Sequence, residues 1–409
     1  MRIGHGEQVF EVRPGEPMGG YADRTHGVGG VLDPLEVHVV TFAAGGRRFA
    51  LVVADLVCVN ADVAGQVRDA LRELRIDDCW VAATHTHASP EAGCRPGGGP
   101  TPPDVGRRLV EAAVSAAKAA VADERDATLT SVRAEVADLA GRRTAGAADR
   151  LAVPVDALVV SAGGRVTGVV TVTPVHPTVL PAGNSDVSAD LNGAIRRALR
   201  APGRWAVAAT GAAGDISTRH TRRGRSPAEL DRLASLVAAA LPLPPNQTPA
   251  PAPAPSRPGP DTIGPALERR VRLEPRTATE LAAATAATAD GSADERTRHV
   301  FDQGRRIAGE LAARGEPYDV DVQAVRLGGV TLVAIPGELF LELGEAIRAG
   351  AGLDVIVVGY ANGYLGYLPS RGTSPTYETL VSPVRLGSGE QVVDAAVDAA
   401  RSVTGEEST

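Results

Sequence analysis

Two histidines separated by one residue, His85 and His87, carry the strongest chemical signal in the sequence. They follow the apolar segment 79–83, Cys-Trp-Val-Ala-Ala, which predicts a short buried strand. Because strand side chains alternate between faces, the two imidazoles would point to the same side. Neutral imidazole is the commonest metal ligand in proteins. The stretch therefore predicts metal ligands at a strand end, although a lone His-x-His is a weak motif.

Two further apolar segments end in residues of the same chemical kind. Residues 166–175 run into His176, and residues 330–335 run into Glu338. Two or three imidazoles with one carboxylate are a typical ligand set for catalytic Zn²⁺, which makes hydroxide available at neutral pH. Taken singly, His176 is better explained as a turn histidine and Glu338 as a charge favoured at a helix N-terminus. Their occurrence at three strand ends favours a shared site.

A serine after another apolar segment has two interpretations. Residues 205–209 are followed by a turn that contains Gly-Asp-Ile-Ser and ends at Ser217. The turn could present a nucleophilic serine, but it lacks the G-x-S-x-G spacing of a nucleophile elbow. A serine that caps a helix or closes a turn fits the same residues.

Alternating strands and helices would position these residues. Apolar residues at i, i+3 and i+4 predict helices, and short apolar runs predict buried strands. The pattern predicts an α/β fold with a mixed, largely buried β-sheet flanked by helices and the metal site at strand ends. The glycine-rich first forty residues predict a closely packed loop. The main predicted strands are 36–42, 48–54, 79–83, 127–136, 156–161, 166–175, 205–209, 319–327, 330–335 and 354–358, and the main helices are 62–74, 104–122, 188–199, 227–241, 339–349 and 391–402, with one or two more in 275–314.

One low-complexity stretch divides the chain. Residues 242–260 contain proline at a density that precludes helix and sheet, which predicts an extended linker. Two proposed ligands precede this stretch and Glu338 follows it, so both halves must build one site. We therefore expect a single catalytic domain over residues 1–405, with residues 242–260 as a surface linker.

Composition narrows the class of protein. A net charge of -7 and 3% aromatic residues argue against a nucleic-acid partner, which requires a concentrated basic face. Three cysteines, Cys58, Cys79 and Cys94, argue against a disulfide framework and favour a reducing compartment. The first residues lack the apolar region of a secretory signal, and no apolar run reaches the ~18 residues of a membrane span. A cytoplasmic protein without integral membrane association is expected.

Taken together, the motifs resemble the neutral, non-lysosomal ceramidase family in its N-terminal catalytic domain. The resemblance is collinear over most of residues 10–400, which makes the order of the motifs more specific than any one of them. Thr-His-Thr-His at 84–87 looks like the family's T-H-T-H, and Gly-Asp-Ile-Ser at 214–217 is similar to its G-D-V-S. The other matching stretches are His-Pro-Thr at 176–178, Ser-Ala-Asp-Leu-Asn-Gly at 188–193, Pro-Gly-Glu at 336–338 and Tyr-Leu-Gly-Tyr-Leu at 364–368.

The resemblance implies roles for eight side chains. The family's zinc would be held by His85, His176, Glu338 and Tyr367, and His87 would face the substrate and the water. The resemblance also implies that Ser217 lies near the polar head of the substrate. It further implies that Arg142 and Tyr377 stabilise the oxyanion.

The resemblance implies a zinc-dependent hydrolase that cleaves a linear amide, with a small-molecule or lipid-like N-acyl amide as substrate. The scarcity of aromatic residues and the lack of a basic amphipathic stretch argue against action on lipid bilayers. Two alternatives stay open. One is a pathway-specific amidase or cyclase that acts on a small soluble metabolite, and the other is a non-catalytic α/β binding protein whose histidines are structural.

Overall fold

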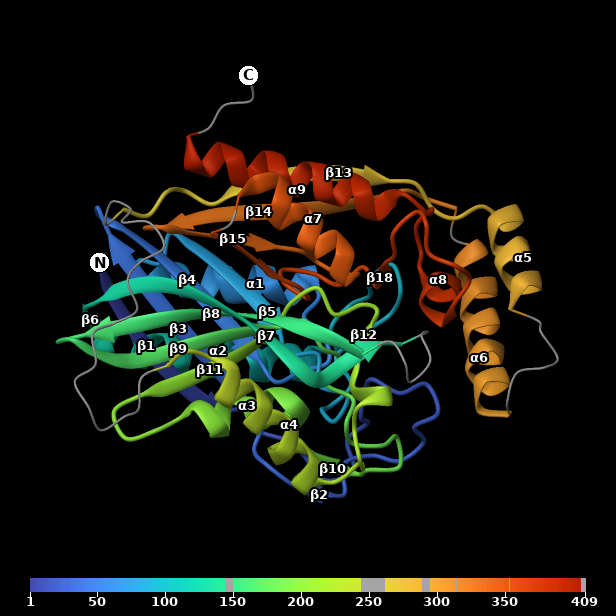
Figure 1. Cartoon of the computed structure of the whole chain (residues 1–409), viewed down its shortest axis with the longest axis horizontal. Coiled ribbons are helices and arrows are strands. Elements are labelled where there is room, and N and C mark those ends of the chain that lie inside the picture. The colour runs from blue at the N-terminus through green and yellow to red at the C-terminus, as the bar shows by residue number, and fades with distance from the viewer. Residues whose placement is uncertain (144–149, 244–261, 289–294, 314, 353, 406–409) are drawn as a thin grey trace.

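A computed structural model describes residues 1–143, 150–243, 262–288, 295–313, 315–352 and 354–405. Over these ranges, strands and helices build a mixed α/β molecule in which sheets lie at the centre and helices cover the outside (Figure 1). The predicted fold class is confirmed. Over the same ranges, the strands form two five-stranded sheets, one four-stranded sheet and two two-stranded ladders.

The first sheet carries the strand that leads to the histidine pair. Its order is β5-β4-β3-β1-β6, with antiparallel pairing except between β4 and β5, which are parallel. Helices α1 and α2 pack on its outer face. The bounds are β1 Arg2–Val9, β3 Glu36–Ala44, β4 Arg47–Ala54, β5 Asp78–Ala83, β6 Arg125–Asp126, α1 Ala61–Leu71 with a 3₁₀ turn η1 Arg72–Leu74, and α2 Pro103–Asp123.

The second sheet leads to His176, and its order is β11-β9-β8-β7-β12. Strands β9 and β11 run parallel, and helices α3 and α4 cover this side. The bounds are β7 Thr128–Arg142, β8 Arg150–Ala162, β9 Arg165–Thr173, β11 Trp205–Thr210, β12 Ile216–Ser217, α3 Asp190–Leu199, the 3₁₀ turn η2 Thr218–His220, and α4 Pro227–Ala240.

The third sheet leads to Glu338, and its order is β13-β14-β15-β17 with β15 and β17 parallel. Helices α7 and α9 cover it, and α5, α6 and α8 lie at one end of the molecule (Figure 1). The bounds are β13 Leu267–Leu273, β14 Tyr318–Leu327, β15 Val330–Ala334, β17 Val355–Val358, α5 Ala278–Ala287, α6 Glu295–Ala312, α7 Leu341–Ala351, α8 Tyr377–Val381 and α9 Ser388–Thr404, and the two-stranded ladders are β2 Gly30–Val31 with β10 Asp186–Val187 and β16 Glu338–Leu339 with β18 Tyr367–Leu368.

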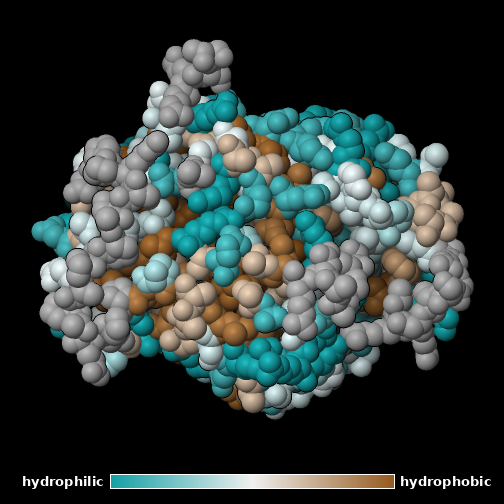
Figure 2. All heavy atoms as spheres, viewed as in Figure 1, coloured by the Kyte–Doolittle hydropathy of each residue, from teal (hydrophilic) through white to brown (hydrophobic). Residues whose placement is uncertain are grey.

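One hydrophobic core is shared by all three sheets. It brings together Phe49 and Trp80 of the first sheet, Val170 of the second, and Leu332 and Ile356 of the third. On the face shown in Figure 2, hydrophilic residues cover much of the top and bottom, and hydrophobic residues show mainly in the middle. Because segments from both halves of the sequence build this core, the strand ends are held at fixed positions relative to one another.

The first forty residues depart from the expected loop, because Arg2–Val9 forms strand β1. Gly4 and Gly6 alternate along the face that packs on α2, where a Cβ would lie 2.0 Å from the Ala120 carbonyl oxygen and 2.1 Å from that of Ala116. The close approach of the helix therefore requires glycine on this strand. The same glycines remove the alternating apolar pattern by which a strand is recognised in sequence.

Two other expectations concern the chain as a whole. No helix in the described ranges is both long enough and apolar enough to span a membrane. From residue 244 onward, the predicted proline-rich linker lies outside the described residues. The single-domain organisation stays a prediction, with the mixed core as its support.

Candidate metal centre

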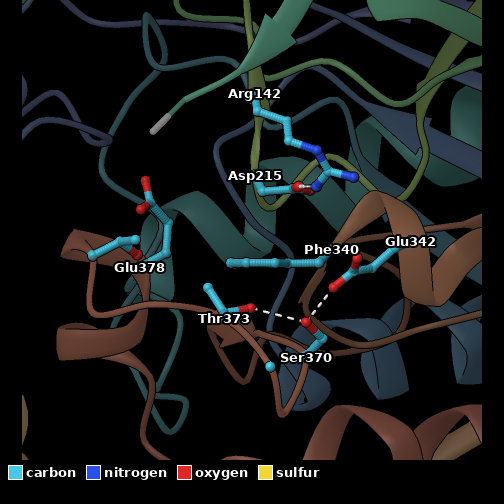
Figure 3. A pocket seen from close by; sticks show the side chains of 9 residues that line it. Arg142, Asp215, Phe340, Glu342, Ser370, Thr373 and Glu378 are labelled. Atoms are coloured by element: carbon cyan, nitrogen blue, oxygen red, sulfur yellow. Dashed lines mark hydrogen bonds and ion pairs between the residues drawn. The ribbon is translucent and has the colours of Figure 1, made fainter. Parts of the chain in front are cut away.

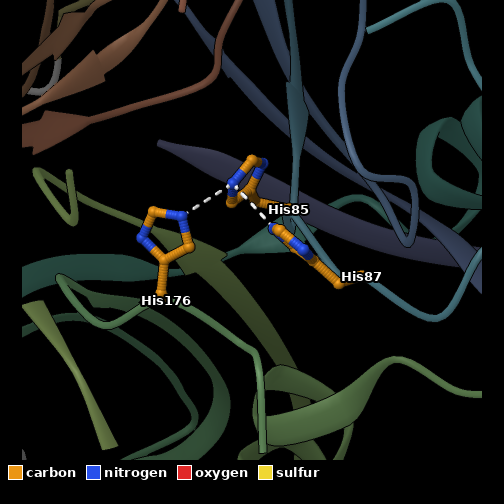
Figure 4. A group of neighbouring side chains, drawn as sticks. All are labelled: His85, His87 and His176. Carbon is orange, nitrogen blue, oxygen red and sulfur yellow. Dashed lines mark hydrogen bonds between the residues drawn. The ribbon is translucent and has the colours of Figure 1, made fainter. Parts of the chain in front are cut away.

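Three imidazoles from two sheets meet at one point, as Figure 4 shows. His85 follows β5, with a backbone φ of 64°, and His176 follows β9. Nε2 of His85 lies 3.1 Å from Nε2 of His176 and 3.3 Å from Nε2 of His87. The structure therefore brings together all three histidines that the sequence singled out.

Hydrogen bonds to backbone carbonyls fix the orientation of two of these rings. His85 Nδ1 donates to the carbonyl of Val57 over 2.6 Å, and His176 Nδ1 donates to that of Ala213 over 2.8 Å. Because a carbonyl can only accept, both protons reside on Nδ1 and both Nε2 atoms present lone pairs. Two lone pairs 3.1 Å apart repel each other unless a cation lies between them.

Glu338 completes a set of three ligand atoms. Its Oε2 lies 3.1 Å from His176 Nε2 and 3.4 Å from His85 Nε2, and it has no other hydrogen-bond partner among the described residues. Two ligands about 2.1 Å from one tetrahedral Zn²⁺ are separated by about 3.4 Å. The three atoms therefore fit a zinc ion in spacing and in chemistry.

Electrostatics maintain the protonation states that a metal requires. Burial lowers the pKa of His176 to about 4 and that of His87 well below its ordinary value, so both rings are neutral at pH 7. Burial alone would raise the pKa of Glu338, but positive charge at the adjacent His85 and His176, which a bound cation would also supply, lowers it well below the ordinary value. Neutral imidazoles beside an ionised carboxylate are the forms that bind metal.

His87 differs from the other two histidines. Its Nδ1 is buried and has no hydrogen-bond partner in the described part of the chain. The ring packs edge-on against Tyr21, with centroids 4.9 Å apart, and a Cβ on Gly20 would lie 2.7 Å from it. Gly20 has a φ of +93°, so glycine is required here for both the backbone conformation and the space. The ring is held by packing, and its Nδ1 is left for another partner.

Tyrosines surround the histidines. Tyr360 stacks on His85 with ring centroids 4.1 Å apart, and Tyr364 donates from its hydroxyl to Glu338 Oε1 over 2.5 Å. Tyr367 pairs with Glu338 across the β16–β18 ladder, and its ring stacks on His176 at 6.1 Å. Sequence reasoning did not select Tyr360 or Tyr364 for the site, although Tyr364 is the first tyrosine of the matching Y-x-x-Y stretch.

Adjacent arginines at the end of β7 point to different partners. Arg142 forms an ion pair with Asp215 at 2.6 Å, whereas Arg143 donates to the Tyr367 hydroxyl over 2.9 Å and pairs with Glu378 at 3.1 Å. Because side chains alternate between the two faces of a strand, neighbouring residues point to opposite sides, and a shift of one residue in the sequence assignment selects the wrong arginine. Arg143, which sequence reasoning missed, is therefore the arginine that faces the metal centre.

Ser217 and Tyr377 lie at the border of the site. Ser217 pairs with His176 in an isolated β-bridge, but its Oγ accepts from the backbone N–H of Arg219 over 3.3 Å and caps η2. That is the capping role considered for it from sequence. Tyr377 begins α8 with its ring 6.4 Å from that of Tyr367, and burial raises its pKa to about 12.

A cavity of about 260 Å³ lies at the end of β7, and none of the proposed metal ligands lines it (Figure 3). Its wall includes the Arg142–Asp215 pair, and Ser370 donates to Glu342 at its edge. Glu378 also lines the cavity and pairs with Arg143, so it links the cavity to the tyrosines around the histidines. The lining residues are Arg142, Asp215, Phe340, Glu342, Ser370, Gly372, Thr373, Thr376 and Glu378.

The expectation of unpaired cysteines is wrong for two of the three. Cys58 and Cys94 form a disulfide across a sequence separation of 36 residues, and Cys79 is buried with a free thiol. The bridge lies next to the metal centre, because Cys58 follows Val57, whose carbonyl orients His85. Disulfides persist in oxidising compartments, which does not support the expected cytoplasmic location.

Comparison with known proteins supports the resemblance at the level of the fold. No family model and no curated protein sequence matches the chain. A solved ceramidase in complex with C2 superposes with a TM-score of 0.72 at 18% identity, covering 100% of this chain and 76% of the other. Neutral ceramidase from Pseudomonas aeruginosa superposes with a TM-score of 0.69 at 19% identity, covering 98% of this chain and 75% of the other. The chain has the fold of the neutral ceramidases.

Proposed function

We propose that this protein is a zinc-dependent hydrolase that cleaves a linear amide. The observation that carries the proposal is the convergence of His85 Nε2, His176 Nε2 and Glu338 Oε2, with both imidazole protons committed to backbone carbonyls. Ceramidases hydrolyse an N-acyl amide, and the ceramidase fold of this chain supports the same class of reaction.

Bound at these atoms, Zn²⁺ would supply a Lewis acid that polarises a carbonyl and makes hydroxide available at neutral pH. His85, His176 and Glu338 would hold it, and the hydrogen bond from Tyr364 orients the Glu338 carboxylate. Tyr367 is the proposed fourth ligand. Arg143, which donates to the Tyr367 oxygen, supplies the positive charge that compensates a phenolate.

The proton transfer that amide cleavage requires falls to His87. A neutral imidazole accepts a proton from water and later donates it to the leaving amine. The buried Nδ1 without a partner leaves this ring able to do so, whereas the Nδ1 protons of His85 and His176 are engaged. The Tyr377 hydroxyl, close to Tyr367, is the proposed donor to the carbonyl oxygen as negative charge develops there.

The charged cavity is connected to the site through Glu378, Arg143 and Tyr367, and it favours a polar portion of the substrate there. Four of its lining side chains are charged, namely Arg142, Asp215, Glu342 and Glu378. Such a wall disfavours an acyl chain, because burial of a hydrocarbon against charges gains little and leaves the charges desolvated. This observation favours the second candidate function, an amidase or cyclase that acts on a small soluble amide.

Metal analysis tests the ligand assignment. His85→Ala and Glu338→Ala should each lose one equivalent of zinc relative to the wild type, measured by elemental analysis of freshly purified protein. His299→Ala is the matched control, because this histidine is exposed on α6 and should retain all the metal. Full zinc content in both ligand variants would contradict the assignment.

Turnover then separates the candidate functions. Short N-acyl amino alcohols and a long-chain ceramide should be compared with the metal-loaded wild type. Preference for the short amide supports a soluble substrate, and preference for ceramide supports a lipid-like one. A metal-loaded protein that hydrolyses no linear amide would contradict the proposed activity and leave a binding protein as the explanation.

A further inference from the structure

A second group of metal-ligand side chains lies on two neighbouring strands of the first sheet, β1 and β3. His5 and Glu7 are two residues apart on β1 and share a face, and the antiparallel register places His38 of β3 directly opposite Glu7. Strands β3 and β1 are two and three strands from β5, which corresponds to about 10 and about 14 Å at the spacing between neighbouring strands. This group therefore shares no residue with the centre at His85.

The ligand atoms of the three side chains converge. His5 Nε2 lies 3.2 Å from His38 Nδ1, and Glu7 Oε2 lies 3.6 Å from His38 Nδ1 and 4.0 Å from His5 Nε2. These separations bracket the roughly 3.4 Å expected between two ligands of one tetrahedral ion. Two imidazoles and a carboxylate with that spacing suit zinc, cobalt, nickel or copper.

A fourth side chain orients His38 in the way that metal-binding histidines are oriented. His38 Nε2 lies 3.1 Å from Glu36 Oε2, and because a carboxylate only accepts, the imidazole proton lies on Nε2. His38 Nδ1 therefore presents its lone pair toward His5 and Glu7.

The charges around the group balance in favour of a cation. Three carboxylates, from Glu7, Glu36 and Asp55, face two guanidiniums, from Arg196 and Arg200. Arg200 donates to Glu7 Oε2 and so competes with an ion for this carboxylate. The Glu7 side chain is 43% exposed, which gives an ion a path from solvent to the two buried rings.

We propose that His5, Glu7 and His38 form a second metal site, which binds a divalent transition-metal ion between β1 and β3. A simpler arrangement uses the same atoms without metal. In it, His5 Nε2–H donates to His38 Nδ1, and Glu7 pairs only with Arg200. The first arrangement predicts that the group binds a metal ion, and the second predicts that it binds none.

Trp205 provides a reporter beside the group. Its ring stacks on that of His5 with centroids 4.6 Å apart and planes 12° apart. The sequence has two tryptophans, and Trp80→Phe leaves Trp205 as the source of tryptophan fluorescence. Co²⁺ quenches an indole at such a distance, so metal-free Trp80→Phe protein titrated with Co²⁺ should lose fluorescence saturably.

Variants in the Trp80→Phe background then test each side chain. Glu7→Gln and His38→Gln should raise the Co²⁺ concentration needed for half-maximal quenching at least tenfold. Arg200→Gln should lower this concentration, because it removes the cation that competes for Glu7. His85→Ala should leave it unchanged. The half-exposed Glu7 is the informative position if His38→Gln fails to fold. His26→Gln is the matched histidine control, since His26 contacts the Asn184 carbonyl away from this group.

Metal stoichiometry provides the second readout. After dialysis against Co²⁺, the wild type should contain one more equivalent of bound cobalt per chain than Glu7→Gln. Quenching that Glu7→Gln and Arg200→Gln leave unchanged, or quenching that disappears in His85→Ala, would overturn the proposal. A wild type that binds no metal at the His85 centre but shows the predicted quenching would count only against the proposed hydrolase function.

Discussion

The disulfide between Cys58 and Cys94 makes a quantitative prediction about stability. The bridge closes a loop with a sequence separation of 36 residues. In the chain-entropy treatment, a loop of that length removes about 13 cal/mol/K from the unfolded ensemble, or about 4 kcal/mol at 25 °C. An unfolding entropy of about 2.1 cal/mol/K per residue over 409 residues converts this to a Tm change of about 4 to 5 °C.

Scanning calorimetry with and without a phosphine reductant checks this value. Reduction should lower the Tm of the wild type by about 4 to 5 °C. Cys58→Ala/Cys94→Ala should have a Tm close to that of the reduced wild type, and the reductant should not change it. Cys79→Ala is the matched control, because its buried thiol is free and the variant should still respond to reduction. Thiol titration of the unreduced, denatured wild type should count one thiol.

The same experiment examines the link between the bridge and the metal centre. The carbonyl of Val57, next to Cys58, accepts the proton that orients His85. We expect the reduced protein to bind zinc more weakly than the oxidised protein, and competition with a chromophoric chelator would measure the difference. Three free thiols in the unreduced, denatured wild type, or a Tm that does not change on reduction, would refute the reasoning.

Two further predictions concern buried charges. Arg143→Met should lower the free energy of unfolding by about 3 to 5 kcal/mol, because Glu378 and the Tyr367 hydroxyl lose their buried partner. In urea denaturation, Arg143→Met/Glu378→Gln should recover part of this loss. Additive losses for the two substitutions would contradict the pairing. Burial raises the pKa of Asp156 from 3.8 to about 6, so the stability of the wild type relative to Asp156→Asn is greatest below about pH 4 and should fall by about 3 kcal/mol as the pH rises to 7. A constant difference between the two proteins in urea denaturation from pH 4 to pH 7 would contradict this prediction.

Much of the site could be inferred from sequence because it rests on local patterns. An apolar run that ends in a histidine or glutamate marks a strand end, and His85, His176 and Glu338 were selected in that way. The long alanine-rich helix was predicted too, since Val105, Leu109, Ala113 and other small residues recur on one face and are buried in α2. These features depend on neighbours within a few residues.

The parts that sequence did not give depend on distant contacts or on single-residue register. Strand β1 was missed because Gly4 and Gly6 serve the approach of α2 rather than an apolar pattern. The choice between Arg142 and Arg143 depends on which face of β7 turns inward. The Cys58–Cys94 pairing follows from the folding of the intervening strand β5, which no spacing rule reports.

Metal content in two variants tests the central claim most directly. Glu338→Gln removes the charge of a proposed ligand, and His87→Asn removes the proposed proton-transfer group that does not hold the metal. The account predicts that Glu338→Gln loses one equivalent of zinc relative to the wild type, whereas His87→Asn retains it and loses amide turnover. Equal zinc in Glu338→Gln and the wild type, or loss of zinc in His87→Asn, would contradict the account.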